Sequence, residues 1–66
     1  GTSSVSWRLD GRIISTTEAC DIKVYDTTGR LVASAAAANT LNLEALPAGI
    51  YILQAGDDTR AKIALR

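Results

Sequence analysis

The chain has 66 residues, with seven basic and seven acidic side chains and no histidine. This length allows one domain, and the balanced charge excludes the basic surface that binds nucleic acid or an anionic membrane. Without histidine, Ser–His and Cys–His catalysis and histidine-ligated zinc are excluded, and the single cysteine, Cys20, excludes an internal disulfide. We therefore expect a non-enzymatic domain with no cofactor and no metal.

The first residues predict a short hairpin. We interpret the small polar residues Gly1, Thr2, Ser3 and Ser4 as a linker end. It precedes a single domain over residues 5–66. The stretch 5–9 alternates apolar and polar side chains, which is typical of a strand. Asp10 and Gly11 form a strong hairpin signal. Ile13 and Ile14 then predict a second short strand.

The next segment predicts a half-buried strand and a turn. A polar break at residues 15–18 precedes residues 20–25, in which apolar and polar side chains alternate clearly. Asp26 can accept backbone N–H bonds, and Gly29 can take a positive φ without steric cost. Residues 26–29 therefore predict a four-residue turn.

Residues 31–46 fit two structures. The alanines at 35–38 favour a helix intrinsically. Asn39 and Thr40 interrupt that helical pattern, and Leu41 and Leu43 alternate with polar residues. We predict a strand, a loop and a strand here, with a helix as the alternative.

The last third predicts two more strands. Pro47 and Gly49 suit a turn at residues 46–49, and the nearly continuous apolar run 49–55 suits a central strand. A hairpin loop at 56–58 precedes a final alternating strand over 61–66. In total, about seven short strands with turn signals between them predict an all-β antiparallel sandwich or barrel.

Three motifs along the chain occur in a recognisable order. They are IKVYDTTGRLV at 22–32, LNLEALPAGIYIL at 41–53 and AKIALR at 61–66. Together they resemble the C-terminal sorting domain of proteins exported by the type IX (Por) secretion system of Bacteroidetes. The resemblance covers residues 20–66. The chain departs from the family pattern at its start, where many members have a Tyr-Pro-Asn-Pro strand and this chain does not.

The resemblance implies an immunoglobulin-like β-sandwich and a targeting function. In this family the type IX translocon reads the folded domain and exports its cargo across the outer membrane. The implied partners are translocon components, a sortase-like peptidase and an N-terminal cargo domain. The implied location is the periplasm in transit, then the outer-membrane surface or the extracellular space.

Members of the family differ in what happens after export. In most, the peptidase removes the domain and the cargo is attached at the surface or released, whereas a minority retain the domain. The alternative function for this chain is therefore a retained immunoglobulin-like binding or adhesion module at the cell surface. Recognition of a glycan would need exposed aromatic side chains, and only Trp7, Tyr25 and Tyr51 are present.

The resemblance also singles out candidate residues. By parity, Arg60, Lys62 and Arg66 share one face of the last strand. One interpretation is that they dock against a receptor, and the other is that they form a solvated face that blocks aggregation. The candidate recognition residues are Arg60, Lys62, Ile63, Leu65 and Arg66. The family-motif residues, interpreted as mainly structural, are Tyr25, Asp26, Gly29, Arg30, Leu46, Pro47, Gly49 and Tyr51. The candidate processing region is Gly1, Thr2, Ser3 and Ser4, because a peptidase needs an accessible segment.

Three other features have plain structural interpretations. Trp7 is expected to be the largest core residue, with an exposed anchor as the alternative. Cys20 is expected to be a small buried apolar residue. Asp57 and Asp58, even with Asp26, offer too few oxygens for calcium, so we expect a polar loop there. The oligomeric state is not predicted, although an edge-strand dimer is compatible with the pattern.

Overall fold

The fold is an antiparallel β-sheet, as the alternation of the sequence predicts. The computed structural model describes residues 6–56 and 59–66. The five strands are β1 (Trp7–Asp10), β2 (Ile13–Asp26), β3 (Leu31–Asn42), β4 (Gly49–Ala55) and β5 (Thr59–Leu65). No helix occurs in these described ranges. Accordingly, the described residues contain no helix that is long and apolar enough to cross a membrane.

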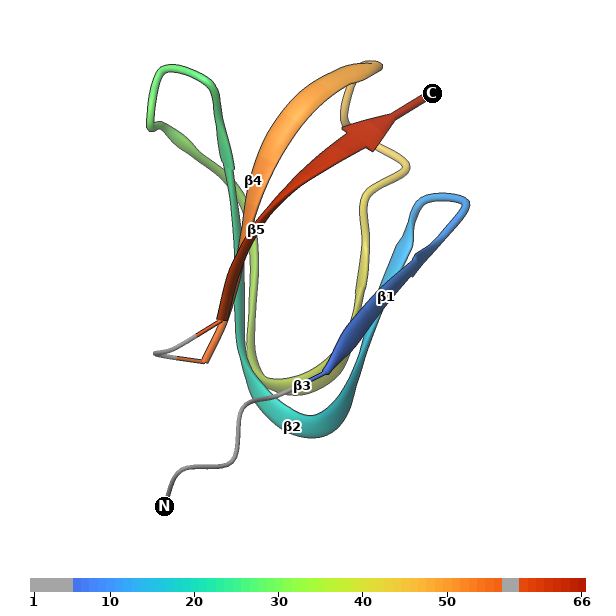
Figure 1. Ribbon diagram of the computed structural model, residues 1–66, viewed down its shortest axis with the longest axis vertical. Coiled ribbons are helices and arrows are strands. Elements are labelled where there is room, and N and C mark those ends of the chain that lie inside the picture. Colours follow the sequence, from blue (N-terminus) through green and yellow to red (C-terminus); the bar gives the residue numbers. More distant parts are fainter. Residues whose placement is uncertain (1–5, 57–58) are drawn as a thin grey trace.

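The long central strand β2 is shared by two parts of the sheet. Its first part, residues 13–16, pairs with β1 on one side, and residues 13–15 pair with the end of β3 on the other. Its last part, residues 22–26, pairs with β4 on one side, and residues 22–25 pair with the start of β3 on the other. β5 pairs with β4. Because β2 and β3 bend together, the sheet curls into a U with two arms (Figure 1).

Irregular pairing marks the bend of the U. The register of β2 against β3 shifts between Ser15 and Cys20 and again between Cys20 and Ile22. On the facing strand, Ala37 has a φ of 49°, a left-handed conformation that is uncommon outside glycine. Its N–H donates to Asp21 Oδ1 at 3.1 Å. Such bulges bend a strand and increase its twist without ending it.

The strand count differs from the prediction of about seven. The polar stretch 15–18, which was predicted as a break, lies within the continuous strand β2, and Asn39 and Thr40, which were predicted to interrupt residues 31–46, lie within the continuous strand β3. The helical alternative for 31–46 is wrong, because residues 31–42 form β3. Alternation still identified the strand faces, but it could not distinguish a bend within a strand from the end of a strand.

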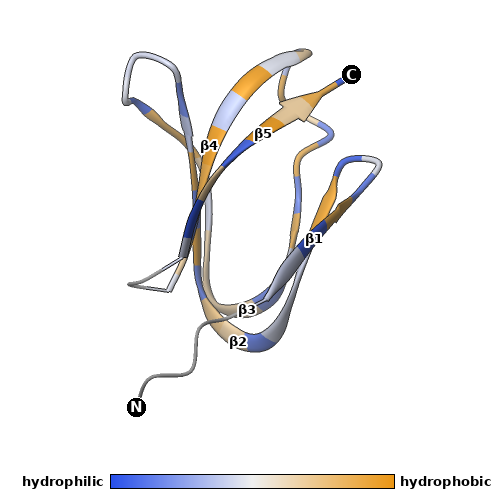
Figure 2. Ribbon diagram, viewed as in Figure 1, coloured by the Kyte–Doolittle hydropathy of each residue, from blue (hydrophilic) through white to orange (hydrophobic). Residues whose placement is uncertain are grey.

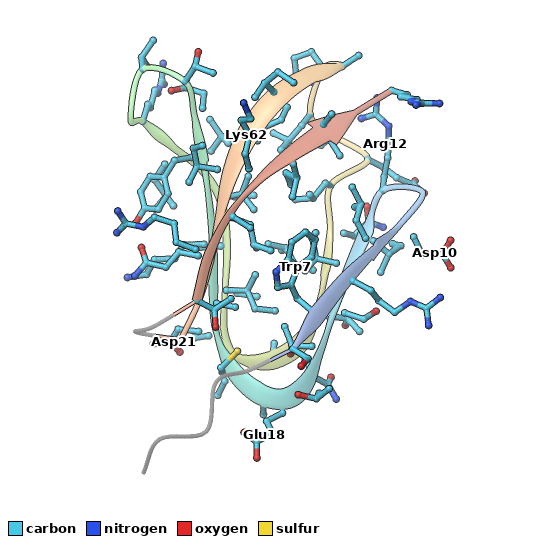
Figure 3. All side chains as sticks on the ribbon, in the orientation of Figure 1. Trp7, Asp10, Arg12, Glu18, Asp21 and Lys62 are labelled. Atoms are coloured by element: carbon cyan, nitrogen blue, oxygen red, sulfur yellow. The ribbon has the colours of Figure 1, made fainter. Side chains whose placement is uncertain are left out.

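The hydrophobic core lies inside the U, between its two arms, and apolar segments lie along both arms (Figure 2). The buried core residues are Ile14, Ile22, Val24, Leu43, Tyr51, Leu53, Ile63 and Leu65. Trp7 and Cys20 are partly buried and pack against this core, and Figure 3 shows Trp7 between the arms. Both residues therefore border the core and are only partly buried, whereas the sequence predicted Trp7 as the largest core residue and Cys20 as a buried residue.

Candidate recognition surface

The last strand presents two different faces. Arg60, Lys62 and Arg66 are exposed, as their parity predicts. Ile63 and Leu65 are each only 4% exposed and belong to the core. The five candidate recognition residues thus divide into three that a partner can reach and two that hold β5 to the rest of the fold. Within the described chain, β5 pairs with β4 alone, so it is an edge strand.

The side chains around Arg60 and Lys62 extend across four strands. Cross-strand pairs place Leu31, Tyr25, Ile52 and Lys62 in one row and Ser34, Lys23, Gln54 and Arg60 in the next. These eight residues, which we call the outer face, lie on the side of the arm opposite the core. The face combines apolar side chains with three cations.

A hollow of about 330 Å³ opens on the outer face. Its lining consists of Tyr25, Asp26, Thr27, Gly29, Ile52, Gln54 and Arg60. Tyr25 is half-buried here, on the outer face, and so it does not pack in the core as Tyr51 does. Alternation along β2 accounts for this position, because Tyr25 follows the buried Val24 and therefore lies on the opposite face of the strand.

The turn beside the hollow is held by Asp26. Its Oδ1 accepts hydrogen bonds from the Thr28 hydroxyl (2.5 Å), the Thr28 N–H (2.9 Å) and the Arg30 N–H (3.0 Å). The bond from the Thr28 side chain, followed by that from the Arg30 backbone, lowers the pKa of Asp26. Gly29 has a φ of 88°, which glycine adopts without a Cβ clash. Asp26 and Gly29 therefore define the geometry of this turn.

The second family motif forms another tightly bonded turn. Tyr51 is buried, and its hydroxyl donates to the Pro47 carbonyl at 2.6 Å. The Tyr51 ring thus packs in the core while its hydroxyl bonds to the adjacent turn. The Leu46 N–H donates to the Leu43 carbonyl at 3.1 Å, which closes the segment between β3 and β4.

Arg12 is a structural residue that the sequence analysis missed. It lies in the β1–β2 turn, and its guanidinium reaches three carbonyl oxygens from distant segments. Nη1 donates to Leu46 (2.5 Å) and, at 3.4 Å, to Leu43, whereas Nη2 and Nε donate to Arg66 at 2.7 and 3.2 Å. Figure 3 shows Arg12 beside the end of β5. The only signal in the sequence is an arginine after Asp10 and Gly11, which does not reveal these partners.

The processing region 1–4 and the acidic pair Asp57 and Asp58 lie outside the described residues. Over the ranges 6–56 and 59–66, no group of three or more His, Cys, Asp or Glu side chains is arranged to hold a metal ion. Cys20 is a free, half-buried thiol whose Sγ lies 4.0 Å from Thr16 Oγ1.

The geometry defines a small antiparallel β-domain with an edge strand and an exposed outer face. The family model described as "Secretion system C-terminal sorting domain" matches residues 9–65, almost the whole described fold. The chain belongs to this family and is a sorting domain of the type IX secretion system. Searches of curated proteins and of solved structures gave no match.

Membership of this family defines the general function. A type IX sorting domain directs the export of a parent cargo protein across the outer membrane, toward the cell surface or the extracellular space. Its interaction partners are therefore the type IX machinery and that parent protein.

Proposed function

We propose that this domain is the folded handle by which the type IX translocon recognises its parent protein, through β5 and the outer face. The match of the family model over residues 9–65 carries this proposal. A translocon that accepts unrelated cargoes needs one feature that they share, and a compact domain supplies it. We further propose that the domain, residues 5–66, has no catalytic activity of its own.

The exposed edge of β5 offers a physical mode of recognition. An edge strand presents unpaired N–H and C=O groups to which a receptor strand can add. The outward side chains Arg60, Lys62 and Arg66 would then lie beside that receptor, while Ile63 and Leu65 keep β5 attached to the core. Main-chain bonds would supply general affinity, and the basic side chains would supply specificity.

The curled sheet supports the immunoglobulin-like sandwich as the underlying architecture. One arm contains β1 with parts of β2 and β3, and the other contains β4 and β5 with the remaining parts of β2 and β3. If β2 and β3 are each divided at the bend, the arms resemble the two facing sheets of a sandwich. On this proposal the two long strands correspond to pairs of shorter strands in the family fold.

The proposed fate of the cargo follows the majority of the family. The parent protein passes through the periplasm, and a sortase-like peptidase removes the domain on its N-terminal side before surface attachment. The mass of cargo purified from the cell surface tests this step. A mass that still includes residues 50–66 would show retention instead of removal.

The alternative of a retained glycan-binding module has less support. Trp7 and Tyr51 both contact the core, so they do not provide the exposed aromatic platform that such a module would use. Tyr25 alone among the three aromatic residues belongs to the outer face.

Export of a reporter tests the proposed function. Residues 1–66 are fused to the C-terminus of a reporter with a signal peptide, in a bacterium with a type IX system and in an isogenic strain without the translocon. A matched fusion carries Leu53→Asp, which places a carboxylate in the core where Leu53 is fully buried and unfolds the domain. We expect export of the unchanged fusion in the competent strain alone. Equal export by the Leu53→Asp fusion, or export without the translocon, would overturn the proposal.

A further inference from the structure

The outer face has the character of a docking surface for an acidic partner. We infer that it binds a protein surface of the type IX machinery on which carboxylates surround an apolar side chain. This inference rests on the proposed function, and it adds the chemistry of the partner and the extent of the contact. The surface includes β2, β3 and β4 as well as the last strand.

The eight residues of the outer face carry charges of one sign, although Asp26 also lines the hollow that opens there. Lys23, Arg60 and Lys62 belong to this face, and none of its eight residues is acidic. At the two ends of this part of β2, Asp21 and Asp26 accept hydrogen bonds from backbone N–H groups within the domain. The three cations therefore have no carboxylate partner on the outer face itself, and an acidic partner would complement them.

The other acidic residues of the described chain lie elsewhere. Asp10 ends β1, Glu18 lies at the bend of the U, and Glu44 follows β3. Figure 3 shows Asp10 and Glu18 well away from Lys62. Among the described residues, the three cations of the outer face thus lie apart from Asp10, Glu18 and Glu44, and this separation favours approach of an acidic partner toward the outer face.

Apolar side chains lie among these cations. Leu31 is 48% exposed and lies in the same row as Tyr25 and Ile52. Ile50, which is 44% exposed, lies two residues along β4 from Ile52. The 330 Å³ hollow between Tyr25 and Arg60 has room for a side chain of the partner. Tyrosine and arginine are enriched at protein interfaces.

This mixture favours a protein partner over a lipid surface. Elements that lie on membranes segregate a broad apolar face from a basic one, so that the apolar face enters the lipid. On the outer face, the row that holds the apolar side chains also contains Lys62, and the adjacent row contains Lys23 and Arg60, so the apolar side chains do not form a broad face free of cations. A protein surface can match such a pattern side chain by side chain.

The size of the surface predicts a transient complex. Four strands about 4.8 Å apart, over five residues of about 3.4 Å each, span roughly 20 Å by 17 Å. This is roughly half of the 800 Å² that each partner buries in a standard stable interface. The contact is expected to form quickly, to dissociate quickly and to weaken as salt is added.

Charge reversal on the two arms tests the inference. The reporter fusion carries either Lys23→Glu with Lys62→Glu on the outer face, or Arg8→Glu on the exposed side of β1 in the other arm. A third fusion carries Lys23→Gln with Lys62→Gln. Thermal melts of the purified fusions verify that each domain is folded. We expect the double glutamate variant to lose at least tenfold in export, the glutamine variant to lose less, and Arg8→Glu to stay within twofold of the unchanged fusion.

The outcomes separate this inference from the proposed function. Export of the unchanged fusion together with normal export of the folded double glutamate variant would overturn the inference alone. A loss with Arg8→Glu of half the logarithmic size, which its charge change of two against four would produce, would also overturn it, because the effect would then be one of net charge. Failure of the unchanged fusion would overturn the proposed function. Finally, binding of the unchanged purified fusion to anionic phospholipid vesicles, lost in the double glutamate variant, would assign the surface to lipid and refute a protein partner.

Discussion

Arg12 is expected to make the largest contribution of any polar side chain to the stability of this domain. Its guanidinium connects the β1–β2 turn to Leu46 and to Arg66 at the end of β5, with short hydrogen bonds to both carbonyls. It is half-buried, so part of its charge is still solvated. A hydrogen bond from a charged group contributes about 1.5–3 kcal/mol when buried and less when exposed. We therefore expect Arg12→Ala to lower the free energy of unfolding by about 2 kcal/mol.

The same loss can be expressed as a change in melting temperature. For a domain of this size, 1 kcal/mol corresponds to about 4–8 °C, so the expected fall in Tm is about 8–16 °C. Arg12→Lys keeps the charge but has one ammonium in place of a planar fork, so it cannot serve both carbonyls equally well. It should recover less than half of the loss.

Thermal and urea unfolding, followed by circular dichroism, measure these differences. Arg8→Ala is the matched control, because Arg8 is exposed on the adjacent strand and should change the stability by less than about 0.5 kcal/mol. Hydrogen exchange should also show faster opening of β5 in Arg12→Ala. A loss no larger than that of Arg8→Ala would refute the reasoning, because the bonds to distant carbonyls would then contribute nothing.

Three further predictions concern single positions. Leu53→Ala, at a fully buried core residue, should cost about 2–5 kcal/mol and leave little folded protein at room temperature in circular dichroism. Ala37→Gly should raise the stability by about 0.5–1 kcal/mol in urea unfolding, because Ala37 has a positive φ; a loss would show that its Cβ matters more than its backbone. Asp26→Asn should lower the Tm at pH 7, because the ionised carboxylate accepts three hydrogen bonds. The pKa of Asp26 is lowered in the folded state, so the contribution of its carboxylate to stability is complete above about pH 4 and disappears as the pH falls through the folded pKa. The difference in Tm between the unchanged domain and Asp26→Asn should therefore shrink in acid. A difference that stays constant with pH would contradict this.

Alternation in the sequence predicted most of the faces of the strands. Ile63 and Leu65 are buried while Lys62 is exposed, as a period of two requires. The turn at Asp26 was also predictable, because its bonds are local and depend on residue types within five positions. Features that depend on neighbours in sequence were therefore accessible without a structure.

Features that depend on distant segments were not accessible. The partners of Arg12 lie 31 to 54 residues away along the chain, and nothing near Arg12 in the sequence specifies them. The neighbours of Tyr25 in its row, Leu31 and Ile52, depend on the pairing of β2 with β3 and β4. The bend at Ala37 depends on a hydrogen bond to Asp21, which alanine propensity cannot indicate.

The two faces of β5 have a consequence for how sorting signals of this kind are tested. Deleting residues 62–66 removes Ile63 and Leu65 from the core and the Arg66 carbonyl from Arg12, so it destabilises the fold at the same time as it removes a possible contact. Loss of export after that deletion would be expected whether the translocon reads the last strand or only requires a folded domain. Substitution of the outward side chains leaves the core unchanged, because the buried and exposed positions of β5 alternate. Only variants of the second kind can separate recognition of β5 from its role in folding.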